Sequence, residues 1–148
     1  MTFPIIFILF ILIVLTTQQK GFYKSTRIGK RGRPFTMWKL RTMKSCPTIT
    51  THITTIDDPR ITPLGHFLRQ TKLDELPQLW NVLKGDMSLV GPRPDVPGFA
   101  DTLVGEDRIL LNIRPGITGL ATLAFRDEEV ILANQKDPEA YNREVIWP

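Results

Sequence analysis

The chain has 148 residues, the length of one ordinary domain, and its 42% hydrophobic and 23% charged residues exclude a disordered protein. The net charge of +4 hides an asymmetry. Residues 1–56 contain nine Lys or Arg and no acidic residue, whereas residues 57–148 contain ten Lys or Arg against fifteen Asp or Glu. This pattern favours an anionic membrane surface or substrate at one end, and it argues against nucleic acid, which would need a basic surface across the folded body.

Residues 3–15 are apolar without interruption. As a helix they would span roughly 20 Å, less than the ~30 Å hydrocarbon core of a bilayer. No Lys or Arg precedes them and no small-residue cleavage site follows, which disfavours a secretory signal peptide. A basic cluster typical of a cytoplasmic membrane face comes next: Lys20, Lys24, Arg27, Lys30, Arg31 and Arg33. We therefore expect residues 1–19 to form a re-entrant or interfacial membrane anchor and residues 20–148 a cytosolic domain; a buried helix and a complete membrane span are the alternatives.

The first half of the body contains three predicted elements. Turn-forming residues at 29–34 precede the weakly alternating segment 35–41, and this order predicts a β-hairpin. The Thr-rich segment 45–57 is expected to be an exposed loop. A short helix is predicted over 62–70, with Pro63 in its first turn, where a missing N–H is tolerated.

A second helix is predicted from near Leu76 to Gly85, because apolar residues recur at helical spacing and Gly is a common helix terminator. Pro77 would fit only in its first turn. This start leaves Asp74 and Glu75 at the N-terminal lip of the helix. A brief strand is predicted at 88–90, leading into the rigid loop 91–94.

The remainder is predicted to contain a helical stretch at 97–111, a loop at 114–119, and a charged helix with an irregular end at 127–148. We find no internal repeat and no domain linker. The expected fold class is therefore α+β: a mainly helical small domain with a short β-hairpin, preceded by the hydrophobic membrane helix.

Asp74 and Glu75 are the first candidates for chemistry. Two carboxylates at a helix N-terminus are expected to stay ionised, because the helix dipole and free N–H groups favour negative charge. An ionised Asp can attack phosphorus, and a neighbouring Glu can hold Mg²⁺ against diphosphate oxygens. The alternative is a purely structural role, since acidic residues commonly cap the first turn of a helix.

Four basic residues are candidate phosphate contacts. Arg93 lies between two prolines that fix its backbone, and Arg114 precedes a Pro-Gly turn. Lys39 and Arg41 are alternate residues, so on a strand their side chains would share a face. For each of the four, a solvated surface charge is the alternative.

Other common sites are not indicated. Cys46 is the only cysteine, so an intrachain disulfide is excluded, a reducing compartment is favoured, and no catalytic thiol is expected. His52 and His66 lack metal-ligand spacing, which argues against zinc. The sequence contains no Walker A loop, no dinucleotide-binding glycine motif and no serine nucleophile elbow.

Taken together, the segments resemble the bacterial sugar transferases of the monotopic phosphoglycosyl transferase type. The resemblance covers about residues 4–147, and its most specific block runs from Leu73 to Pro94. Further matching stretches are Arg27–Gly29, Gly32–Thr36, Lys39–Met43, Asp58–Thr62 with Gly65, Phe67, Leu68 and Arg69, and Arg114–Ala121.

The resemblance implies a two-step reaction. Asp74 would attack the β-phosphate of a UDP-sugar and expel UMP, and the bound phosphosugar would then pass to undecaprenyl phosphate. Glu75 would carry Mg²⁺. The substrate-binding residues it implies are Lys39, Arg41, Arg69, Arg93 with its flanking Pro92 and Pro94, and Arg114.

The resemblance also implies a location and a role. Such enzymes lie on the cytoplasmic face of the bacterial inner membrane and start a capsule, exopolysaccharide, O-antigen or glycoprotein glycan. Pro4 matches the proline of a Ser-Pro break in a longer hydrophobic helix, but Phe3 replaces the serine. We therefore expect a chain truncated at both ends relative to the family. An inactive membrane-bound nucleotide-sugar-binding module and a basic membrane adaptor are the alternative functions.

Overall fold

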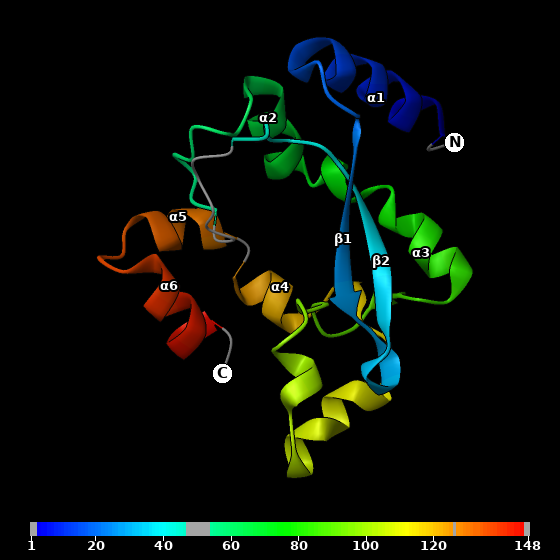
Figure 1. The fold of residues 1–148 in the computed structure, drawn as a ribbon, viewed down its shortest axis with the longest axis vertical. Coiled ribbons are helices and arrows are strands. Elements are labelled where there is room, and N and C mark those ends of the chain that lie inside the picture. Colours follow the sequence, from blue (N-terminus) through cyan, green and yellow to red (C-terminus); the bar gives the residue numbers. More distant parts are fainter. Residues whose placement is uncertain (1–2, 47–53, 126, 147–148) are drawn as a thin grey trace.

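A β-hairpin forms the centre of the molecule, and helices surround it (Figure 1). The computed structural model describes residues 3–46, 54–125 and 127–146. Strands β1 (Phe22–Ile28) and β2 (Pro34–Leu40) pair antiparallel, with Phe22 opposite Leu40. The 3-10 turn η1 (Lys30–Gly32) joins them and contains two successive residues with positive φ. The predicted hairpin is confirmed.

Helix α1 (Phe3–Thr17) lies at one end of the hairpin. Leu9 and Ile13 on its inner side are buried against Leu40 and Leu68. Other apolar side chains of the helix are exposed: Ile5, Phe7, Ile8, Ile11, Leu12 and Leu15. Within the described residues, no helix is both long and apolar enough to cross a membrane.

Helix α2 (Pro63–Thr71) confirms the predicted short helix, including proline in the first turn. The Thr62 hydroxyl caps it by accepting a hydrogen bond from the Gly65 N–H at 2.9 Å. Gly65 must be glycine, since a Cβ there would lie only 2.1 Å from the Thr42 carbonyl oxygen. This close approach holds α2 against the chain just after β2.

The next helix begins slightly later than predicted. A 3-10 turn, η2 (Leu73–Glu75), is followed by α3 (Gln78–Lys84), and Gly85 ends α3 with a φ of 83°. The fully buried Asn81 joins α3 to β2: its amide donates to the Thr36 carbonyl at 2.7 Å and its oxygen accepts from the Trp38 N–H at 3.3 Å. The chain carrying Asp74 and Glu75 is thereby fixed against the hairpin.

A second small sheet was not fully predicted. Strand β3 (Ser88–Val90) is present as expected, but the segment predicted as a loop at 114–119 contains β4 (Gly116–Thr118), which pairs with β3 in parallel. Gly91 and Gly116 make the contact possible, since a Cβ on Gly116 would lie 2.2 Å from the Gly91 nitrogen. The loop prediction was wrong because turn-type residues here serve close backbone packing.

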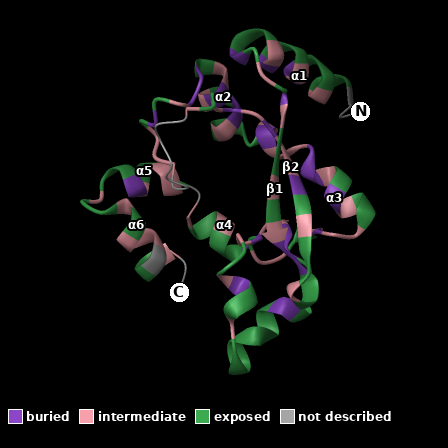
Figure 2. Ribbon diagram, viewed as in Figure 1, coloured by how far each residue is buried: buried purple, intermediate pink, exposed green. Residues whose placement is uncertain are grey.

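Helical structure occurs in the predicted stretch at 97–111, but as two 3-10 segments, η3 (Ala100–Thr102) and η4 (Gly105–Asn112). Leu103 and Val104 separate them, and Gly105, the first residue of η4, has a positive φ of 64°. Ala100 and Leu111 pack against Ile28 at the far end of the hairpin. Figure 2 shows that this region is largely exposed, whereas buried residues gather where α1, α2 and the hairpin meet.

The C-terminal part consists of short pieces rather than the single charged helix predicted. They are α4 (Leu120–Ala124), α5 (Glu128–Ala133), α6 (Pro138–Tyr141) and the π-helical turn η5 (Asn142–Ile146). The predicted loop at 45–57 lies largely outside the described residues. The fold is thus a mixture of helices and two small sheets, in agreement with the expected α+β class, while the membrane role of the first helix stays a prediction.

Candidate active site

Asp74 lies in η2, where the chain turns from α2 into α3. The residue is only 6% exposed, and its Oδ1 atom has no hydrogen-bond partner among the described residues. A buried carboxylate oxygen without a partner is costly in a folded protein and is therefore uncommon. The atom is suited to accept an electrophile or a cation that is not part of this chain.

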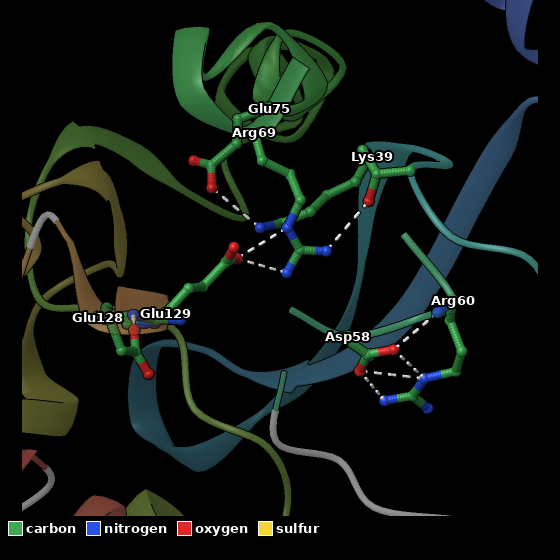
Figure 3. Close-up of polar contacts among 9 residues, drawn as sticks. Lys39, Asp58, Arg60, Arg69, Glu75, Glu128 and Glu129 are labelled. Atoms are coloured by element: carbon green, nitrogen blue, oxygen red, sulfur yellow. Dashed lines mark hydrogen bonds and ion pairs between the residues drawn. The ribbon is translucent and has the colours of Figure 1, made fainter. Parts of the chain in front are cut away.

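Glu75 is held by a lysine from the hairpin. The Lys39 Nζ donates to Glu75 Oε1 at 2.9 Å, and both side chains are partly buried (Figure 3). Lys39 belongs to β2 and lies opposite Tyr23. The hairpin and η2 therefore meet at a charged contact, which brings Lys39, a predicted phosphate contact, to the acidic pair.

The two neighbouring carboxyls have opposite pKa shifts. Burial raises the pKa of Asp74 above its ordinary value, and the nearby charge of Lys39 opposes this only in part. Burial would also raise the pKa of Glu75, but the charge and hydrogen bond of Lys39, together with the charges of Lys72 and Arg93, lower it overall. The shift at Asp74 runs against the expectation of a carboxylate kept ionised by a helix N-terminus, because η2 buries this side chain.

Arg69 comes from the last turn of α2 and is fixed by two partners. Its Nε and Nη2 atoms contact Glu129 Oε1 at 2.7 and 2.6 Å, and its Nη1 donates to Thr42 Oγ1 at 3.1 Å. Figure 3 shows the Arg69 guanidinium pointing toward Glu129. The positive charge of Arg69 also lowers the pKa of Asp74, which places the guanidinium within electrostatic reach of that carboxyl.

Arg93 is paired with Glu128 of α5, although its own side chain is more than half exposed. Its charge lowers the pKa of Glu75, so it too acts on the acidic pair. The flanking prolines act through their backbones: the Pro94 carbonyl accepts from Arg27 Nη1 at 3.3 Å, and the Pro92 carbonyl accepts from the Gly116 N–H at 2.8 Å. The rigid loop is thus joined to β1 and β4.

Arg41 and Arg114 make no direct contact with the acidic pair among the described residues. Arg41 donates to the Lys20 carbonyl at 2.8 Å, and its guanidinium lies 5.9 Å from the centre of the Tyr23 ring. It lines a shallow surface depression with residues from the end of α1. Arg114 is exposed, and within the described chain no hydrogen bond or ion pair joins either arginine to Asp74 or Glu75.

Four residues near the site were not singled out from the sequence. Thr42 and Glu129 hold Arg69, Glu128 holds Arg93, and Arg27 contacts the Pro94 carbonyl. Glu128 and Glu129 appeared only as part of a charged tail. The one sequence signal for Glu128 and Glu129 is that they are adjacent at the start of a helix. Acidic residues are common at that position in any helix, so the signal does not indicate a functional site.

The donor set at this site suits Mg²⁺. In the part of the chain that the structure describes, no three His, Cys, Asp or Glu side chains converge to form a complete metal cage. Mg²⁺ in phosphoryl-transfer sites needs no such cage, since it is bound by one or two carboxylates together with substrate phosphates. Glu75 and the unpartnered Asp74 oxygen provide that number of carboxylates.

Comparison with known proteins identifies the family. The model of the bacterial sugar transferase family matches residues 1–143. The chain belongs to this family. The matched range contains the acidic pair, the basic residues discussed above, and Glu128 and Glu129.

Three relatives of this sugar transferase carry specific names. A Bacillus subtilis (strain 168) protein, 46% identical over 70% of this chain and 58% of its own length, is provisionally named an undecaprenyl-phosphate N-acetylgalactosaminyl 1-phosphate transferase. The UDP-galactose-lipid carrier transferase of Erwinia amylovora is 37% identical over 81% of this chain and 29% of its own. The UDP-glucose:undecaprenyl-phosphate glucose-1-phosphate transferase of Escherichia coli (strain K12) is 35% identical over 97% and 32%. The chain thus spans 58% or less of the length of these three relatives.

Proposed function

We propose that this sugar transferase moves a phosphosugar from a UDP-sugar to undecaprenyl phosphate. The names of its relatives support the two substrates. The observation that carries the proposal is the buried Asp74 Oδ1, which lacks a partner among the described residues and lies next to Glu75 in η2. The charges of Lys39 and Arg69 oppose the rise in the Asp74 pKa that burial causes, and such cations also offset the negative charge of a phosphate under attack.

In the first step, an Asp74 oxygen forms a bond to the β-phosphorus of the donor. The bond from that phosphorus to the bridging oxygen breaks, and UMP leaves with the electron pair. In the second step, an oxygen of undecaprenyl phosphate attacks the same phosphorus and releases the Asp74 carboxylate. The product is a polyprenyl diphosphate sugar, and Asp74 ends unchanged.

The surrounding side chains divide the remaining work. Lys39 orients Glu75, and Glu75 with Asp74 would hold Mg²⁺. The ion supplies charge neutralisation at the diphosphate oxygens when it is bound. Arg69 and Arg93 would bind donor phosphates, with Pro92 and Pro94 fixing the loop that carries Arg93.

Arg41 and Arg114 have a different place in the proposal. Arg41 lies near the end of α1 with Lys20, where it would contact the phosphate of a lipid. Arg114 follows η4 and precedes β4, so it would reach a donor phosphate from the far side of the loop at 91–94. Both arginines have the charge to bind a phosphate, which the donor provides in its diphosphate and the acceptor in its single phosphate.

The membrane anchor is the other part of the proposal. Helix α1 has 15 residues, about 22 Å, with one side packed on the domain and apolar side chains such as Phe7 and Leu15 exposed. We infer that residues 1–19 lie in the cytoplasmic leaflet of the inner membrane as a monotopic anchor and that the basic residues after them contact anionic lipids. The product would start a capsule, exopolysaccharide, O-antigen or glycoprotein glycan.

The test is UMP release from a panel of UDP-sugars by the full chain in detergent with undecaprenyl phosphate and Mg²⁺. We expect Asp74→Asn to reduce release by at least about 10³-fold, because the amide is a poor nucleophile. Asp107→Asn, an equal change at an exposed acid, is the control. Donor binding without UMP release by the unaltered chain, or full activity of Asp74→Asn, would contradict the proposal.

A further inference from the structure

Helix α5 supplies an acidic partner to a residue sixty positions earlier in the chain. Glu129 Oε1 accepts from both Nε and Nη2 of Arg69, at 2.7 and 2.6 Å, while Nη1 of the same guanidinium donates to Thr42. All three guanidinium nitrogens are therefore engaged. Because the two partners lie on different elements, the planar guanidinium can satisfy both in only one orientation. A single contact would allow it to rotate.

The pair is more protected than an ordinary surface ion pair. The side chains of Arg69 and Glu129 are 20% and 31% exposed, and the Thr42 hydroxyl on the third side belongs to a buried residue. An exposed ion pair adds little to the free energy of unfolding, because both side chains are flexible and water screens their charges. Here the partners are held by α2, α5 and the segment after β2, so the contact defines the position of the guanidinium.

Arg69 matters because it lies close to the acidic pair in the chain and its charge acts on the Asp74 carboxyl. The arginine is in the last turn of α2, and the 3-10 turn with Asp74 follows after Lys72. The contacts to Glu129 and Thr42 use three N–H groups of the five that a guanidinium carries. Two N–H groups of the guanidinium therefore remain outside these contacts.

We propose that Glu129 is a positioning residue for phosphosugar transfer, which fixes the Arg69 guanidinium beside Asp74 without itself touching the reacting phosphate. This inference rests on the proposed function and deepens it by adding α5 to the active site. The alternative is a purely structural tie. In that case Glu129 only attaches α5 to α2, and the position of the guanidinium does not affect the reaction.

Single substitutions at Glu129 make the first test, with UMP release by the full chain as the measurement. In Glu129→Ala the guanidinium keeps only Thr42, and we expect kcat to fall about 10- to 100-fold, with a smaller change in KM for the donor. Glu129→Gln retains an acceptor oxygen at the same reach and is expected to recover most of the loss. The matched control is Asp127→Asn, an equal charge change two residues away at an exposed position. Activity of Glu129→Ala at or above that of the control would overturn the proposal.

Reversal of the pair separates positioning from a structural tie. The double variant Arg69→Glu with Glu129→Arg restores an ion pair between α2 and α5 but moves the cation to α5. We expect the melting temperature to return toward the original value while kcat stays low. Recovery of kcat together with the melting temperature would mean that only the tie matters.

A readout that does not depend on turnover keeps this inference separate from the proposed function. In the ¹⁵N NMR spectrum of the full chain in detergent, the Arg69 Nε–H should be protected from exchange. That protection should be lost in Glu129→Ala and kept in Glu129→Gln. Equal protection in all three would overturn the positioning role. If the unaltered chain releases no UMP from any donor, the proposed reaction fails, and this measurement still decides whether Glu129 fixes Arg69.

Discussion

The two sides of the candidate site are built differently. On one side, η2 and α3 carry Asp74 and Glu75 and are fastened to the hairpin through the fully buried Asn81. On the other side, the short helices that follow β4 carry Glu128 and Glu129, and most of their residues are exposed or half-buried. The core therefore holds the acidic pair, whereas Arg69 and Arg93 take acidic partners from the peripheral helix α5. The proposed nucleophile and the proposed phosphate contacts are thus fixed from two different parts of the molecule.

The largest effect expected inside this comparison is at Lys39, the only cation that connects the hairpin directly to the acidic pair through a contact among the described residues. We expect Lys39→Met to lower kcat/KM for UMP release by about 10- to 100-fold, because Glu75 loses the partner that orients it. Lys24→Met is the control, since its ammonium lies over the Trp38 ring on the other face of the hairpin, at 4.2 Å.

The same substitution should change the pH profile in one direction. Lys39 lowers the pKa of Glu75 and opposes the raised pKa of Asp74, so its loss leaves burial to raise both. Both acids would then be protonated at higher pH than in the unaltered chain. The acidic limb of the kcat/KM profile should move to higher pH in Lys39→Met, and a limb that stays or moves lower would show that Lys39 does not control these carboxyls.

Asn81→Ala tests the core side through stability. The change leaves the Thr36 carbonyl and the Trp38 N–H without their side-chain partner in a buried place, which should cost about 1–3 kcal/mol of unfolding free energy. Thermal unfolding measures this as a drop of several degrees in the melting temperature. Asn134→Ala is the comparison, because that amide bonds only to a carbonyl of its own exposed helix. An equal melting temperature for both variants would show that Asn81 does not fasten α3 to the hairpin.

The smallest effect is expected at Glu128, on the peripheral side. Its partner Arg93 is more than half exposed, so Glu128→Gln should change the unfolding free energy by less than about 0.5 kcal/mol. Because Arg93 remains in place for the donor, KM for the UDP-sugar should change by only a few-fold. A loss as large as that expected for Glu129→Ala would show that both acids of α5 position arginines.

Local signals were enough to predict the elements that depend on neighbouring residues. Pro63 in a first turn, Gly85 at a helix end and the turn residues before β2 each specify their structure within a few positions. Strand β4 was missed because it forms by pairing with a segment 28 residues away, at Ser88↔Gly116, and no periodicity announces such a contact. The 3-10 segments η3 and η4 differ from the predicted helix because the chain leaves the helical conformation at Leu103 and Val104 and has a positive φ at Gly105.

The same limit applies to the candidate site. Asp74, Glu75 and Lys39 were predicted from residue type and family resemblance, and the structure brings all three together. The roles proposed for them stay predictions. Glu129 could not be found this way, because its significance comes from contact with Arg69 across 60 residues. Burial of Asp74 was also missed, since an acid at a helix start is ordinarily exposed, and this burial reverses the expected direction of its pKa shift.

The unpartnered Oδ1 of Asp74 has a thermodynamic consequence for the protein at rest. A buried oxygen with no partner among the described residues makes the folded state less stable than it could be. Any bound group that supplies positive charge to this atom offsets that cost and binds the folded state alone, so ligand binding and folding are linked. We therefore expect the folded chain to gain stability when a cation binds at this oxygen, and a variant without the buried carboxyl to be more stable but inactive.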